Sequence, residues 1–142
     1  MSARYRFHPG TRLALLQGGA PPSLEEWEKA ARKVLDQPGW RGTRRILSDR
    51  RGMDGGFPPG MEKRALAFFI ENAAALGEVQ WAVVVPDDSA AFTTVRLAAE
   101  LSKGTRVRVQ GFTDLDVALA WLLGSSDKDQ IAALMRWIDE CE

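Results

Sequence analysis

The stretch Trp81–Leu123, WAVVVPDDSAAFTTVRLAAELSKGTRVRVQGFTDLDVALAWLL, decides the fold class. The run Val79–Val85 is apolar apart from Gln80, which is typical of a parallel strand that is buried on both faces. A helical pattern follows it. Residues 106–109 then alternate arginine with valine, as expected of a strand with one wet face near a sheet edge. A second helical pattern comes next, so the stretch predicts a β-α-β-α unit of an α/β domain.

Residues that commonly cap helices mark where the helices are expected to begin. Ser23 has Glu26 three positions later, which is the spacing of a capping box. The helix that begins at Met61 is expected to run to Leu76 without a break, because its apolar residues keep helical spacing. The expected starts of the other helices are Asp88 or Ser89, Thr113 with Asp116 in the box position, and Ser126.

The first half of the chain predicts a hairpin followed by β-α units. Two short runs, Arg4–Phe7 and Leu13–Leu16, flank a turn that contains Pro9 and Gly10, which favours antiparallel pairing. Arg44–Asp49 is expected to form the next strand. The whole chain, 1–142, is therefore predicted to be one domain with a mixed sheet of four or five strands, and residues 125–142 are a C-terminal helical extension.

Composition excludes several classes of protein. The formal net charge of the 142 residues is zero, which argues against a dedicated nucleic-acid binder. The single cysteine, Cys141, cannot form an internal disulfide. No apolar run is long enough for a signal peptide or a transmembrane segment, so the expected location is the cytoplasm. No motif calls for a cofactor, and none is expected.

The segment 112–122, FTDLDVALAWL, resembles the end of the SpoIIAA-like branch of the STAS domain family. In that branch a closing strand is similarly followed by a Phe, an Asp and an Ala-hydrophobic-Ala-Trp-Leu helix. The order of elements is similar too, and the resemblance covers about Tyr5 to Leu123. It implies a sheet with helices mainly on one face, and a regulatory role in protein docking or small-ligand sensing rather than catalysis.

The chain departs from the family's phosphorylation motif. Anti-sigma factor antagonists carry an Asp-Ser-Ser-Gly-like turn at the start of their second helix, and one of the serines is phosphorylated. The matching segment here, Asp54–Met61, contains no Ser, Thr or Tyr. Asp49 matches the family's strand-end Asp, but Ser48 lies inside the expected strand and does not take the phosphosite. A kinase-driven switch is therefore not expected at this turn.

The candidate ligand site is the crevice at the carboxyl ends of the parallel strands, where open α/β sheets bind ligands. Helix N-termini and arginines at that edge favour a small anion such as phosphate or carboxylate. The alternative is that the Asp, Ser and Thr residues there only cap helices. The candidate residues are Asp49, Arg50, Arg51, Asp87, Asp88, Ser89, Thr113 and Asp114.

Catalytic and metal sites are not expected. His8 is the only histidine and lies beside a Pro-Gly turn, without a nucleophile at a recognisable spacing. Asp49, Asp87 and Asp88 lack the paired-acid and lysine pattern of a receiver-type magnesium site. Two hypotheses remain: a non-catalytic module that docks a protein partner or senses a small ligand, and an anion-binding protein or enzyme that uses the strand-end crevice.

The last predicted helix also suggests a homodimer. Its apolar stripe consists of Ile131, Leu134, Met135 and Ile138, with Trp137 beside it. Aromatic and Met side chains are enriched in interface cores. The stripe is therefore expected either to pack on the sheet or to meet a second subunit.

Overall fold

The computed structural model describes residues 4–17, 23–36, 44–52, 57–86 and 90–140. Their strands form one five-stranded sheet, in which the strands follow the order of the chain. β1 and β2 form the expected antiparallel hairpin, and the other neighbouring strands are parallel. The predicted α/β class and the mixed sheet are therefore confirmed. The strands are β1 (Arg4–His8), β2 (Leu13–Gln17), β3 (Arg44–Asp49), β4 (Val79–Val84) and β5 (Val107–Phe112).

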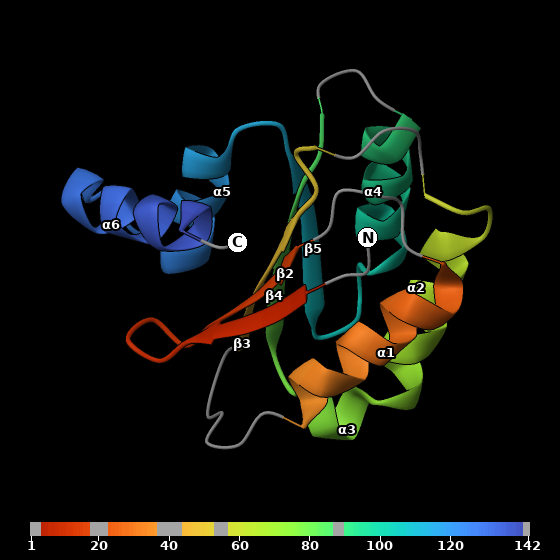
Figure 1. Cartoon of the computed structure of the whole chain (residues 1–142). Coiled ribbons are helices and arrows are strands. Elements are labelled where there is room, and N and C mark those ends of the chain that lie inside the picture. The colour runs from red at the N-terminus through yellow and green to blue at the C-terminus, as the bar shows by residue number, and fades with distance from the viewer. Residues whose placement is uncertain (1–3, 18–22, 37–43, 53–56, 87–89, 141–142) are drawn as a thin grey trace.

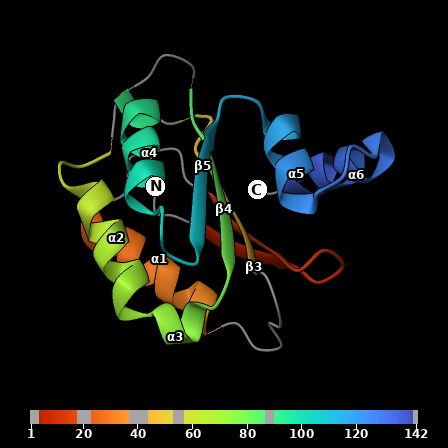
Figure 2. The ribbon, with the colours of Figure 1, turned by 180° about the vertical axis from the view of Figure 1, so that it is seen from behind.

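Helices cover both faces of the sheet, most of them on one face. Figure 1 shows α1 to α4 on one side and α5 and α6 on the other, and the reverse view in Figure 2 agrees. The strand order never reverses from β2 to β5, so right-handed crossovers place the connecting helices on the same face. The helices are α1 (Leu24–Leu35), α2 (Met61–Glu71), α3 (Ala73–Leu76), α4 (Ala90–Leu101), α5 (Leu115–Leu123) and α6 (Lys128–Asp139).

Strand β4 contributes side chains to both hydrophobic cores. Trp81 and Val83 point into the core beneath α1, α2 and α4, whereas Ala82 and Val84 point into the core beneath α5 and α6. Its apolar run predicted this burial on both faces. At the sheet edge, β5 buries Val107 and exposes Arg108, which confirms the expected wet face.

Three local predictions need correction. The helix expected over 61–76 breaks at Asn72, whose side-chain amide donates to Phe68 O at 2.9 Å; this local hydrogen bond competes with helix continuation. The cap of α5 is Asp114 rather than Thr113. The cap of α6 is Asp127 rather than Ser126, because the Asp127 carboxylate accepts from the Asp129 and Gln130 amides. The capping box of Ser23 is confirmed by both of its hydrogen bonds.

The cap of α6 supports a direct test of this correction. Replacing Asp127 with alanine leaves two backbone N–H groups without an acceptor and is expected to destabilise the protein by about 1 kcal/mol. For a chain of this length, the melting temperature should fall by roughly 3 °C. Ser126→Ala is the matched control and should stay within about 0.5 kcal/mol of the parent. A larger loss of stability for Ser126→Ala than for Asp127→Ala would show that Ser126 is the cap of α6.

Helix α6 packs within its own chain. Leu134 and Ile138 are buried with α5 and the sheet. The Arg6 guanidinium lies 4.0 Å from the Trp137 ring centre, and Arg6 Nη1 donates to Trp137 O at 3.0 Å. The homodimer expected through this helix stays a prediction. Among the residues that the structure describes, no helix is long and apolar enough to cross a bilayer.

Candidate functional site

The three consecutive candidates at the end of β3 lie on opposite faces of the sheet. Side chains alternate along a strand, so Asp49 and Arg51 turn toward α6 while Arg50 turns toward α1 and α2. The Asp49 carboxylate, 7% exposed, accepts from Arg51 Nε at 2.9 Å and from Arg51 Nη2 at 3.0 Å. Arg51 Nη2 also donates to Asp139 at 3.1 Å. This pair ties the end of β3 to the last helix.

The pKa of Asp49 reflects this pairing. Burial raises the pKa of the carboxyl, but the hydrogen bonds and charge of Arg51, with a hydrogen bond from Gln17, outweigh burial and hold the pKa below its usual value. The charge of Asp49 is thus neutralised within the protein. The pair has a structural role, because it links the end of β3 to α6. That Asp49 and Arg51 belong to a ligand site stays a prediction.

The two other described candidates, Thr113 and Asp114, do not line the pocket with Arg50. Thr113 and Asp114 are exposed where β5 joins α5. Asp87, Asp88 and Ser89 lie outside the described residues. Ligand crevices at strand ends form where the strand order reverses, and the order from β2 to β5 has no such reversal. The described candidates therefore do not converge on one crevice.

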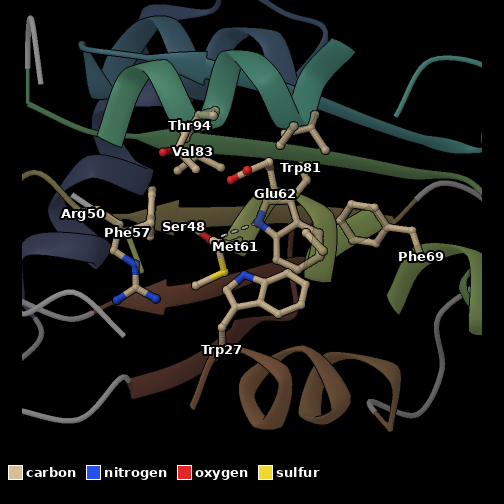
Figure 3. Close-up of a pocket in the computed structure, with 14 residues that line it drawn as sticks. Trp27, Ser48, Arg50, Phe57, Met61, Glu62, Phe69, Trp81, Val83 and Thr94 are labelled. Atoms are coloured by element: carbon tan, nitrogen blue, oxygen red, sulfur yellow. Dashed lines mark hydrogen bonds between the residues drawn. The ribbon is translucent and has the colours of Figure 1, made fainter. Parts of the chain in front are cut away.

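A pocket instead opens between the sheet and α1, α2 and α4 (Figure 3). The cavity volume is about 50 Å³. One water needs roughly 10–15 Å³ on the same measure, so the cavity admits a small chemical group. Its apolar walls include Trp27, Phe57, Met61, Phe69, Trp81 and Val83, and its polar lining is Ser48, Arg50, Glu62 and Thr94.

Aromatic rings form the back wall of the pocket. The indoles of Trp27 and Trp81 stack with ring centres 5.8 Å apart, and Phe69 lies 5.6 Å from Trp81. The Trp81 indole nitrogen donates to Ser48 Oγ at 2.9 Å, which satisfies the buried N–H and fixes the ring. The wall is therefore held in place without a ligand.

Arg50 brings a positive charge into this apolar pocket. The residue is only 2% exposed, and its Nε and Nη1 atoms have no hydrogen-bond partner in the described part of the chain. Burial lowers the pKa of Arg50, although the negative charges of Asp49 and Glu26 act in the opposite direction. Arginine nonetheless stays charged in proteins. A buried guanidinium that lines an apolar pocket is a group with which an anion would pair.

Sequence reasoning named Arg50 but missed the rest of the pocket. Trp81 is the one aromatic residue in the apolar run Val79–Val85, and its Nε1 needs a polar partner when buried. This requirement could have indicated from the sequence that a polar group lies beside Trp81. Trp27, Met61 and Phe69 read as ordinary helical core positions, and only the packing of α1 against α2 brings them beside Arg50. The described residues hold no cluster of three or more His, Cys, Asp or Glu side chains suited to a metal ion.

Comparison of the chain with protein-family models, curated proteins and solved structures finds no match. What stands is the α/β fold itself, a five-stranded mixed sheet that opens with a hairpin. Function has to be inferred from the site.

Proposed function

We propose that this chain is a non-catalytic, STAS-like ligand-sensing module that binds a small anion with an apolar body between the sheet and α1, α2 and α4. The observation that carries the proposal is Arg50, which lines the pocket, is buried to 2% exposure and has two buried nitrogen atoms without a hydrogen-bond partner in the described part of the chain. A buried charge whose hydrogen bonds are not satisfied is unfavourable, so its presence beside a cavity favours a ligand that pairs with it. The proposal keeps the ligand-sensing hypothesis and takes anion binding from the alternative, with the anion in this pocket rather than in the crevice at the strand ends.

The composition of the pocket supports binding rather than catalysis. Neither histidine nor cysteine lies among the described residues that line it. Ser48 Oγ is held by the Trp81 indole N–H, and no base contacts it among the hydrogen bonds of the described chain. Apolar walls with a few placed polar groups are typical of small-molecule sites.

The proposal predicts binding that depends on Arg50. Hexanoate and hexyl sulfate should raise the melting temperature of the parent protein, whereas 1-hexanol, which has the same tail without a charge, should have little effect. A ligand at about 100 times its Kd adds about 2.7 kcal/mol of stability. Replacing Arg50 with methionine should abolish the response to both anions. Thermal unfolding monitored by tryptophan fluorescence measures it, since Trp27 and Trp81 line the pocket.

The matched control is Arg108→Met, which removes an exposed arginine from β5 and changes the net charge equally. This variant should keep the parent's response. Equal shifts in the parent and in Arg50→Met would show that the anions act elsewhere and would overturn the proposal.

A further inference from the structure

The charges around the pocket limit the charge of the ligand. Among the described residues that line it, Arg50 is the only cation and Glu62 is the only carboxylate. Glu26 of α1 adds a further negative charge that acts on Arg50. Asp49, one residue from Arg50, is already neutralised by Arg51. The described part of the lining therefore has one positive and one negative charge.

This balance favours a ligand with a single negative charge. A monoanion pairs with Arg50 and leaves one negative charge in the pocket. A phosphate monoester carries about −1.5 to −2 at pH 7, so it would leave a second negative charge in an apolar pocket whose lining already contains the Glu62 carboxylate. Like charges interact more strongly where water is excluded. The carboxylate of Glu62 thus acts against dianions.

The shape of the pocket fixes where the two parts of the ligand lie. In Figure 3 the Arg50 guanidinium is at one end of the lining residues and Phe69 is at the other, with Met61, Trp27 and Trp81 between them. A head group at Arg50 would therefore extend its apolar body along the thioether and the two indoles. A carboxylate oxygen accepts a charge-assisted hydrogen bond from a guanidinium N–H.

We infer that the ligand is a small apolar monocarboxylate, with its carboxylate on Arg50 and Glu62 excluding dianions such as phosphate monoesters. This inference rests on the proposed function, because it names the ligand class for the same pocket. It adds a specificity-determining residue, Glu62, in the first turn of α2.

The test compares a carboxylate and a phosphate head group, each on an alkyl chain of similar length, at two pH values. Hexanoate and hexyl phosphate are titrated into the protein at about pH 5.5 and at about pH 8, on either side of the phosphate's second pKa of about 6. Hexanoate is largely ionised at both, so its Kd should stay nearly constant. Hexyl phosphate should weaken severalfold at the higher pH, as it becomes a dianion. His8, the chain's only histidine, does not line the pocket.

Glu62→Gln tests the discriminating group. This variant should bind hexyl phosphate at the higher pH severalfold more tightly than the parent, with little change for hexanoate. Glu71→Gln removes an exposed carboxylate from the other end of α2 and should behave as the parent.

The outcomes separate the two proposals. Hexyl phosphate that binds equally or more tightly at the higher pH, through Arg50, would overturn the monocarboxylate inference and leave anion binding intact. If Glu62→Gln discriminates between hexanoate and hexyl phosphate as the parent does, Glu62 does not determine the specificity and that part of the inference fails. If neither anion binds better than 1-hexanol at either pH, both the inference and the proposed function fail.

Discussion

Replacing Arg50 with methionine is expected to raise the melting temperature of the ligand-free protein by about 3–10 °C. The parent protein holds a cation at 2% exposure, and two of its nitrogen atoms have no partner in the described chain. Leaving such donors unsatisfied costs about 1–3 kcal/mol, and more for charged groups. Methionine fills a similar volume without that penalty, and the backbone hydrogen bond from Arg50 N to Val84 O is kept.

The measurement is thermal unfolding of the two proteins without ligand, with Arg108→Met as the control. Arg108 is exposed, so its loss should change stability by less than about 0.5 kcal/mol. A fall in the melting temperature of Arg50→Met would mean that the guanidinium stabilises the fold, and the site would lose its main support. The combination of higher stability with lost binding is the expected mark of a functional residue, because binding sites often retain groups that destabilise the free protein.

The fold could be predicted because local signals and topology agree. The hairpin turn, the apolar run of β4 and the alternation of β5 each report a backbone state directly. Helix caps were harder. Both Ser126 and Asp127 are good cap residues, and the choice between them depends on which carboxylate or hydroxyl reaches the first free amides. Asn72 kept helical spacing in the sequence, yet its amide bonds the preceding turn and α2 ends there.

The candidate site could be predicted only in part. Arg50 was named, but it was grouped with Asp49 and Arg51, although strand alternation separates the three between two faces. The order of the strands was not available from the sequence, so the absence of a reversal in it could not be foreseen. Trp27 and Met61 line the same pocket as Arg50 because two helices pack together, and no local pattern reports this arrangement.

The Arg51→Met variant is expected to lose about 2 kcal/mol of stability at neutral pH, because it leaves the Asp49 carboxylate without its cation. Removing one partner of a fully buried pair costs about 3–5 kcal/mol, and the value is reduced here because Arg51 itself is 39% exposed. Asp139→Asn is the control, since it breaks only the contact between Arg51 and a residue that is 61% exposed. That contact should contribute less than about 1 kcal/mol.

The pH dependence of the two proteins should differ in sign. In the parent, Arg51 holds the pKa of Asp49 below its unfolded value, so this pair stabilises the protein above about pH 4 and the contribution is lost as the pH falls through the folded pKa. In Arg51→Met, burial is the largest remaining influence and raises the folded pKa. Stability from Asp49 is then fully present below about pH 4 and is lost as the pH rises.

The gap in unfolding free energy between the parent and Arg51→Met should therefore narrow from pH 7 toward about pH 4, as measured by urea denaturation. Adding Asp49→Asn to Arg51→Met should recover part of the loss, because the buried charge is then removed together with its partner. A gap that stays constant with pH, or a double variant no more stable than Arg51→Met, would show that Arg51 stabilises the end of β3 through packing rather than through its charge.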